Sequence, residues 1–238
     1  MASRRARRAM AGEGPPREHV AGGTTSPDEI PGRAPHASPD AEPARRHTVT
    51  SMVDDAQRTT YVLVDGENID ATLGTSILSR RPQPDERPRW DRLKNFAEEE
   101  WGQPVKGLFF LAANGDLPMG FIQALLAMEY RPVPLSGRAH EKVVDIAIQR
   151  TLDALADRNA DVMLVSHDSD FVPQLGKLCD GRKVGLVGFL EFRSKAFVEL
   201  ESRGLEFFDL EYDVDAFTAR LPRVRVIPID EFDPFEFI

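Results

Sequence analysis

The most constraining feature of the sequence is an apolar run that leads directly into two carboxylates one residue apart. The run spans Val162 to Val165, and the segment Ser-His-Asp-Ser-Asp at 166–170 follows it. A short apolar run bounded by polar residues is typical of a buried parallel strand, and the spacing over 171–179 indicates a helix. The two aspartates are therefore predicted to lie on a strand-to-helix turn, where open α/β sheets bind ligands. Helix capping by Asp168 or Ser169 is the alternative interpretation.

Strand and helix signals alternate along the middle of the chain. The sequence predicts strands near 61–64, 105–112, 132–134, 162–165, 183–189 and 205–209, and helices near 90–101, 119–130, 141–157, 171–179 and 194–203. Repeated strand and helix units of this length indicate a parallel sheet that is covered on both faces. The expected fold class is therefore α/β, a three-layer α/β/α sandwich with a mainly parallel central sheet, in one domain over 58–212.

The two ends of the chain differ from this middle. Residues 1–57 hold eight Arg, no Lys, seven Pro and no aromatic residue, which predicts a disordered Arg/Pro-rich tail. Residues 213–238 are predicted to form an acidic C-terminal extension. Its last nine residues interleave acids with Phe, and they are interpreted either as a docking peptide for a protein partner or as a solvated acidic tail.

Whole-chain composition excludes several classes of protein. With 41% apolar and 29% charged residues, the 238-residue chain is predicted to be a soluble globular protein. No apolar run approaches the roughly 20 residues that span a bilayer, so no membrane partner is expected. The single cysteine, Cys179, excludes an internal disulfide framework and a Cys-rich zinc site, and it favours a reducing, cytoplasmic location. The sequence leaves the oligomeric state open, a homo-oligomer included.

Four aspartates are expected to meet at one edge of the predicted sheet. Asp65 ends the first strand, Asp168 and Asp170 follow the fourth, and Asp145 lies in the first turns of the preceding helix. Close carboxylates repel one another unless a cation intervenes, and an all-oxygen set selects Mg²⁺ or Mn²⁺ over zinc. The structural alternatives are that Asp65 accepts hydrogen bonds from turn amides and that Asp145 favours the positive end of its helix.

Three segments carry a resemblance to a known family: Val-Asp-Gly-Glu-Asn at 64–68, Lys-Val-Val-Asp at 142–145 and Ser-His-Asp-Ser-Asp-Phe at 166–171. With Val-Pro-Gln-Leu at 172–175 and Gly-Arg-Lys-Val at 181–184, they resemble the NYN domain, a branch of the PIN-like nuclease superfamily. The resemblance implies a PIN-like α/β/α fold and cleavage of RNA by divalent metal held in an acidic cluster. It maps Asp65, Asp145, Asp168 and Asp170 onto the catalytic, metal-binding cluster, and Asn68 onto the polar residue of the first motif.

The sequence departs from the family pattern at two positions. Family members often carry Gly where this chain has His167, and a second Asp where it has Thr151. Loss of that outer carboxylate is expected to weaken a second metal site more than the first. His167 is interpreted either as a substrate contact or as a packed turn residue. A zinc role is disfavoured because His140 is the only other histidine outside the tail.

The leading hypothesis is a metal-dependent ribonuclease, a hydrolase that cleaves RNA phosphodiester bonds. Asp65 and Asp168 are the preferred direct ligands of Mg²⁺ or Mn²⁺. The Arg-rich connection at 80–89 is a candidate for phosphate contacts. Residues expected to contact the RNA substrate near the metal are Asn68, Arg138, Lys142, Arg150, His167 and Ser169.

The sequence allows three alternatives to a ribonuclease to be compared with it. The main alternative is a catalytically weak or inactive module of the NYN fold that binds nucleic acid or regulates a protein partner, which Thr151 favours slightly. A phosphatase of the haloacid dehalogenase type is disfavoured because Glu67 stands where its nucleophile motif needs a second Asp. A dinucleotide-binding Rossmann domain is disfavoured because Gly185 and Gly188 form no Gly-x-Gly-x-x-Gly motif.

Overall fold

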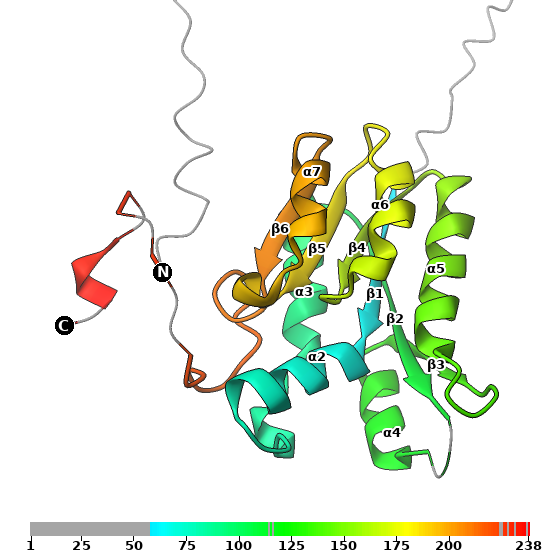
Figure 1. Ribbon diagram of the computed structural model, residues 1–238, viewed down its shortest axis with the longest axis horizontal. Coiled ribbons are helices and arrows are strands. Elements are labelled where there is room, and N and C mark those ends of the chain that lie inside the picture. The colour runs from blue at the N-terminus through cyan, green and yellow to red at the C-terminus, as the bar shows by residue number, and fades with distance from the viewer. Residues whose placement is uncertain are drawn as a thin grey trace, which may run out of the picture. The chain divides into compact units, whose positions relative to one another are not determined.

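The central element of the fold is a fully parallel sheet, which confirms the predicted α/β class (Figure 1). The computed structural model describes residues 58–238 except 114, 116, 224, 225, 228, 231 and 237. The tail predicted at 1–57 therefore lies outside the described residues. Within them the sheet has six strands in the order β3-β2-β1-β4-β5-β6. The strands are β1 (Thr59–Asp65), β2 (Val105–Ala112), β3 (Tyr130–Leu135), β4 (Ala160–Val165), β5 (Val184–Gly188) and β6 (Leu205–Asp209).

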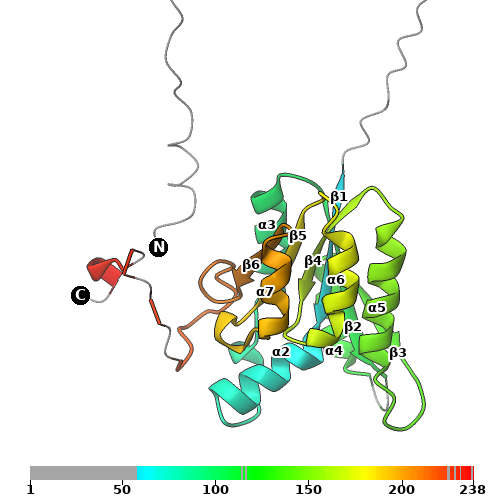
Figure 2. The same cartoon turned by 45° about the horizontal axis from the view of Figure 1, so that its top comes forward.

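Helices cover both faces of the sheet and make three layers (Figures 1 and 2). Successive residues of a strand point to opposite faces, so Val62 packs on one face and Leu63 on the other. The first face is covered by α2 (Gly66–Thr72), α3 (Trp90–Trp101) and α4 (Met119–Ala127). The second is covered by α5 (Val143–Ala156), α6 (Val172–Leu178) and α7 (Val198–Glu201). The short helical turns are η1 (Leu73–Ile77), η2 (Pro84–Glu86), η3 (Ser169–Phe171), η4 (Leu190–Phe192), η5 (Lys195–Phe197) and η6 (Pro234–Glu236).

The strand order places a topological switch point between β1 and β4. These two strands pair in parallel, with Val64 opposite Val165, so they end together. The chain leaves β1 toward β2 on one side and leaves β4 toward β5 on the other. The connections diverge there, and the edge between them is the place where open α/β sheets bind ligands. The order is one that doubly wound nucleotide-binding sheets also use, so the function has to be argued from the side chains at this edge.

One helix was missed in the sequence. The sequence predicts no helix between the first strand and residue 90, but the structure has α2 followed by the π-helix η1 there. Three apolar residues four positions apart, Ile69, Leu73 and Ile77, are all buried and form one helical stripe. That stripe could have been recognised, although Gly74 lies within it. The predicted helix over 119–130 is shorter, because Glu129 adopts a positive φ of 58° and Tyr130 begins β3.

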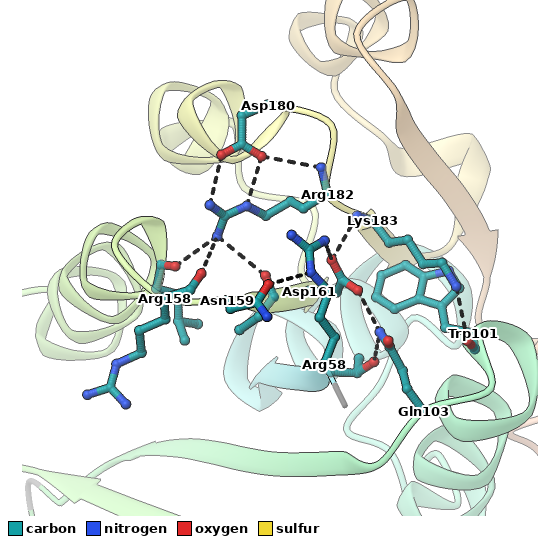
Figure 3. A network of polar contacts seen from close by, with 12 residues as sticks. Arg58, Trp101, Gln103, Arg158, Asn159, Asp161, Asp180, Arg182 and Lys183 are labelled. Carbon is teal, nitrogen blue, oxygen red and sulfur yellow. Dashed lines mark hydrogen bonds and ion pairs between the residues drawn. The ribbon is translucent and has the colours of Figure 1, made fainter. Parts of the chain in front are cut away.

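The opposite, amino-terminal edge of the sheet carries a polar network around a buried aspartate (Figure 3). Asp161 in β4 is 1% exposed and accepts hydrogen bonds from Arg58 and Gln103 and from the backbone of Lys183. Arg182 pairs with Asp180 and donates to carbonyls at the end of α5. These contacts satisfy the buried carboxylate with several donors, which indicates a structural role for this edge.

The chain beyond β6 folds back onto the core. Val214, Ala216 and Phe217 are buried in the hydrophobic core on the face of the sheet that α2, α3 and α4 cover. The domain was predicted to end at 212. That boundary and the acidic extension at 213–238 stay predictions, and the residues just past the boundary contribute to the core. Among the described residues farther along, Val226, Ile229, Phe235 and Ile238 are exposed. No helix among the described residues is long and apolar enough to cross a membrane.

Arg223 anchors this returning segment. Its side chain is 4% exposed, and the guanidinium pairs with Asp209 at 2.6 Å and with Glu211 and Glu191. The guanidinium also lies 4.9 Å from the Tyr212 ring centre and 5.1 Å from that of Phe189. We call Arg223 and its three carboxylates the Arg223 cluster. It fastens the segment to the ends of β5 and β6.

Candidate metal centre

Asp65 lies buried at the end of β1, in the switch point between β1 and β4. Its side chain caps α2 by accepting a hydrogen bond from the backbone N–H of Asn68 at 3.2 Å. Its other oxygen accepts one from the Ser166 hydroxyl at 3.0 Å. Burial raises the pKa of Asp65 to about 6, which these hydrogen bonds partly offset and the nearby Asp145 increases. The site therefore disfavours the free carboxylate, and a bound cation would stabilise it.

Three further aspartates converge beside it. Asp145, Asp168 and Asp170 each present a carboxylate oxygen, and these oxygens all lie within 4.8 Å of one another. We call these three residues the acidic triad. Asp145 comes from the first turn of α5, and the other two from the turn between β4 and α6. The structure thus brings together three of the four predicted aspartates, and Asp145 lies close enough to the fourth, Asp65, to raise the pKa of Asp65 further.

Local hydrogen bonds shape the turn that carries the triad. Asp168 caps η3 by accepting from the backbone N–H of Asp170 at 2.9 Å, so the capping interpretation holds for one of its oxygens. The Ser166 hydroxyl accepts from the backbone N–H of Asp168 at 3.2 Å while it donates to Asp65. Ser166 is fully buried and was not predicted as a site residue. Its place at a strand terminus, two residues before Asp168, was the available signal.

Lys142 lies at the centre of the acidic triad. Its Nζ is 3.2 Å from Asp145, 3.3 Å from Asp170 and 4.0 Å from Asp168. Hydrogen bonds to Asp145 and Asp170 raise the pKa of Lys142. Its side chain is 66% exposed, so solvent screens these pairs. The sequence predicted that Lys142 holds substrate phosphate, which stays a prediction, and the structure adds its contact with the carboxylates.

His167 is held by contacts to both ring nitrogens. Nε2 accepts from the backbone N–H of Phe189 at 2.8 Å, so Nδ1 carries the proton and donates to Asn68 Oδ1 at 3.0 Å. The backbone N–H of His167 donates to the same oxygen at 2.9 Å. A Cβ on Gly188 would lie only 2.7 Å from Nε2, so the ring fills the space that this glycine leaves. Burial lowers the pKa of His167 to about 4.

These contacts favour the packed-turn interpretation of His167 over a substrate contact. They also assign Asn68 a defined task, because its amide oxygen holds the turn between β4 and η3 against the start of α2. The substrate contacts predicted for both residues stay predictions. His167 joins the ends of β4 and β5, one residue before Asp168, and thereby fixes where the acidic turn begins.

The remaining predicted substrate residues are exposed, and they lie close in sequence to the aspartates of the acidic triad. Arg138 lies in the loop before α5 and its backbone N–H donates to Glu141 at 2.8 Å. Arg150 is exposed on α5, and Ser169 is the exposed first residue of η3. Their predicted RNA contacts stay predictions.

Most arginines of the connection at 80–89 have carboxylate partners. Arg80 pairs with Glu86, Arg87 with Asp70 at 2.9 Å, and Arg89 with Asp91 at 3.4 Å. These pairs reduce the positive charge that the segment offers to phosphates. Arg81 is exposed and lines an open hollow beside α2 and η1.

Two polar residues that hold the edge were not anticipated. Gln149 on α5 donates to the backbone oxygen of Asp170 at 3.1 Å, which fastens the acidic turn to that helix. Glu67 accepts from the backbone N–H of Ala112 at 3.0 Å and ties α2 to the end of β2. Glu67 lies within the first motif and Gln149 lies four residues after Asp145, but the partners of both lie far away in sequence.

The fold and this edge together define a class: a parallel α/β protein of the PIN-like nuclease fold with an acidic cluster at its switch point. The chain belongs to the NYN domain family, whose model matches residues 59–211, from β1 through β6. NYN domains are generally nucleases, so the family and the acidic cluster agree on the class.

Comparison with solved structures supports the architecture. The chain is similar to the crystal structure of a protein of unknown function from Vibrio parahaemolyticus, with a TM-score of 0.53 and 18% sequence identity. The match covers 67% of this chain and 96% of that one. At this identity the likeness concerns the fold alone. No curated protein matches the chain.

Proposed function

We propose that the protein is a metal-dependent ribonuclease whose centre is the acidic triad with Asp65 beside it. The observation that carries the proposal is the convergence of three carboxylate oxygens within 4.8 Å at the switch point of the sheet. A structural role alone does not require three like charges at one point, because they repel one another. The family match supports a nuclease, and the choice of RNA follows from the resemblance.

The donor set fits a hard divalent cation. All candidate ligands are carboxylate oxygens, which suit Mg²⁺ or Mn²⁺. The triad offers three oxygens, and Asp65 offers a fourth carboxylate that burial has made unfavourable as a free anion. The sequence favoured Asp65 and Asp168 as direct ligands. The geometry supports Asp145 and Asp170 as equal partners of Asp168, and it supports Asp65 as the buried member beside them.

The residues of the site have distinct tasks in the proposed reaction. When bound, a divalent cation neutralises the phosphodiester and lowers the pKa of a coordinated water. Ser166 orients Asp65 and the backbone of Asp168 relative to each other through one hydroxyl. Asn68 holds the acidic turn in place through His167. Arg138, Lys142 and Arg150 flank Asp145 in sequence, and Ser169 lies between Asp168 and Asp170; these exposed residues are proposed to position the RNA backbone.

One observation favours the alternative of a binding module without turnover. Thr151, which stands where relatives often have a second Asp, donates its hydroxyl to the carbonyl of Ala147 at 2.7 Å. This position therefore supplies no carboxylate for a second metal. The proposed enzyme consequently relies on the acidic triad and Asp65, and a single ion is the simplest loading.

Cleavage assays with purified protein separate the two functions. Single-stranded and structured RNAs are incubated with Mn²⁺, Mg²⁺ or EDTA, and Asp168→Asn serves as the matched control. Cleavage that requires metal and disappears in the variant supports the ribonuclease. RNA binding without cleavage under every metal condition, by a folded protein, would establish the binding module instead.

Three expectations about the protein's setting accompany the proposal. RNA is the proposed partner, and the single cysteine supports the reducing cytoplasm as its location. A protein partner that binds the C-terminal tail is also proposed, and the exposed apolar side chains of Phe235 and Ile238 support it. A homo-oligomer is tested by the mass of the purified protein in solution.

A further inference from the structure

The ammonium of Lys142 occupies the point where the carboxylates of the acidic triad converge. Its Nζ lies 3.2, 3.3 and 4.0 Å from Asp145, Asp170 and Asp168. These are the three residues whose oxygens lie within 4.8 Å of one another. One positive charge therefore already offsets part of their mutual repulsion at the place where a metal ion fits.

We propose that Lys142 is an internal counter-cation of the acidic triad, which a divalent metal must displace when it binds. The inference rests on the proposed function and adds a regulation to the same site. Metal affinity is then set by the carboxylates and also by competition with a side chain that the protein itself supplies. The sequence had assigned this lysine only to the RNA.

The geometry makes the ammonium both effective and displaceable. Lys142 is the residue directly before α5, three positions before Asp145, so the chain delivers counter-cation and ligand from the same turn. Its side chain is 66% exposed and carries a compact, well-hydrated charge on a flexible stem. The ammonium can therefore move into water without leaving a buried donor unsatisfied. A divalent ion and the ammonium repel each other at such short range, so both cannot stay at the centre of the triad.

A second lysine provides a matched control. Lys177 on α6 pairs with Asp153 of α5 at 2.7 Å, and its side chain is 61% exposed, close to the value for Lys142. The two lysines thus share residue type, exposure and an ion pair with an α5 carboxylate. They differ in that Lys177 faces one carboxylate outside the site, whereas Lys142 faces three within it.

The test is direct titration of Mn²⁺, followed by electron paramagnetic resonance of the free ion, with wild type, Lys142→Met and Lys177→Met. Lys142→Met is expected to bind Mn²⁺ about tenfold more tightly, because a positive charge next to the ion is gone. Lys177→Met is expected to match wild type. Melting temperatures give a second readout: without metal Lys142→Met should melt below wild type, and its rise on saturation with Mn²⁺ should be larger. Lys142→Gln replaces Lys142→Met if the apolar variant fails to fold.

The outcomes separate this inference from the function on which it rests. Equal Mn²⁺ affinity of wild type and Lys142→Met, or weaker binding by the variant, overturns the counter-cation and leaves the ribonuclease standing. Absence of Mn²⁺ binding to wild type and to Lys142→Met alike overturns the metal centre itself.

Discussion

Two clusters at the carboxyl edge of the sheet each place three carboxylates around one cation, and they differ in burial. In the Arg223 cluster the arginine side chain is 4% exposed, and the side chains of Asp209, Glu211 and Glu191 are 3%, 8% and 31% exposed. In the acidic triad the Lys142 side chain is 66% exposed and Asp170 is 54% exposed. The same charge arrangement thus occurs once in the interior and once at the surface.

The difference suits opposite tasks. A guanidinium offers a rigid fork of donors and tolerates burial, so Arg223 can fasten a chain segment permanently. Removal of one partner of a buried ion pair is strongly destabilising, because the remaining buried charge is neither paired nor hydrated. An exposed ammonium is bound weakly and exchanges readily with solvent. The interior cluster is therefore a fixed clamp, and the surface cluster is one from which the cation can leave.

Phe189 connects the two clusters. Its ring stacks on His167 with centroids 5.7 Å apart and lies 5.1 Å from the Arg223 guanidinium. Its backbone N–H donates to His167, which precedes Asp168. The clamp thus supports the turn that carries the triad.

The largest expected effect is a loss of catalysis, which should follow substitution in the acidic triad because only this cluster is proposed to bind the catalytic metal. Asp168→Asn should reduce metal-dependent RNA cleavage about a hundredfold or more, because several kcal/mol of charge stabilisation is lost. The amide oxygen still accepts from Asp170, so the fold should persist. Cleavage rates and circular dichroism measure both, with Asp153→Asn as the control outside the site. Wild-type turnover by the folded variant would refute the metal assignment.

The next effect concerns stability. Arg223→Met leaves Asp209 and Glu211 buried without their cation and should lower the free energy of unfolding by about 3–5 kcal/mol. The exposed neighbour Arg220→Met should change it little. Urea denaturation in EDTA measures both. A loss for Arg223→Met no larger than that for Arg220→Met would mean that the cluster is not a clamp.

His167, which contacts Phe189 between the two clusters, should make the free energy of unfolding depend on pH. Burial holds the pKa of folded His167 at about 4, below the ordinary value of 6.5. Between these values the unfolded chain binds a proton that the folded protein does not, so His167 makes stability fall as the pH falls from 6.5 to 4. The slope is at most about 1.4 kcal/mol per pH unit. Asp65, with its pKa raised to about 6, acts in the opposite direction over part of this window.

Subtraction of two curves isolates the histidine. Wild type and His167→Gln share Asp65, so the difference between their unfolding free energies in EDTA, from pH 4.5 to 7.5, reports His167 alone. Wild type should lose more stability than the variant on acidification. Parallel curves would show that the ring is protonated as easily in the folded protein as in the unfolded chain.

The sheet edge and its aspartates could be predicted because they depend on local patterns. The apolar run before Ser166 identifies β4, and parallel strands that end together bring Asp65 and Asp168 to one edge. The arrangement of the four aspartates within that edge was harder to predict from the sequence. The sequence could not indicate that the acidic triad groups Asp145 with Asp168 and Asp170 while Asp65 is buried beside them.

Long-range partners and side-chain directions account for what was missed. Arg223 lies 32 residues from Glu191, and no local pattern relates the two. Lys142 was expected to face phosphate because it is one of the cations that flank Asp145 in sequence. In the structure its flexible side chain turns instead toward carboxylates from the next helical turn and from another loop. The direction of such a side chain depends on the three-dimensional fold and cannot be read from the sequence.

The smallest expected effect tests whether the exposed cation has a second position, which the buried one lacks. If metal displaces Lys142 from the acidic triad, its ammonium becomes available to RNA phosphate only in the loaded protein. Binding of one single-stranded RNA is therefore measured as a function of salt, once in EDTA and once in saturating Ca²⁺, a cation expected to occupy the site without supporting cleavage. Wild type is compared with Lys142→Met, and Lys177→Met is the control.

Each phosphate contact contributes about 0.7 to the slope of log affinity against log salt for a single strand. In Ca²⁺ the slope of Lys142→Met should be shallower than that of wild type by about this amount, and in EDTA the slopes should coincide, because the ammonium is then held by Asp145 and Asp170. Lys177→Met should follow wild type in both. A slope difference of the same size in EDTA would mean that Lys142 reaches the phosphates whether or not metal is bound. In that case the ammonium and the carboxylates do not compete, and the surface cluster differs from the Arg223 cluster only in its exposure.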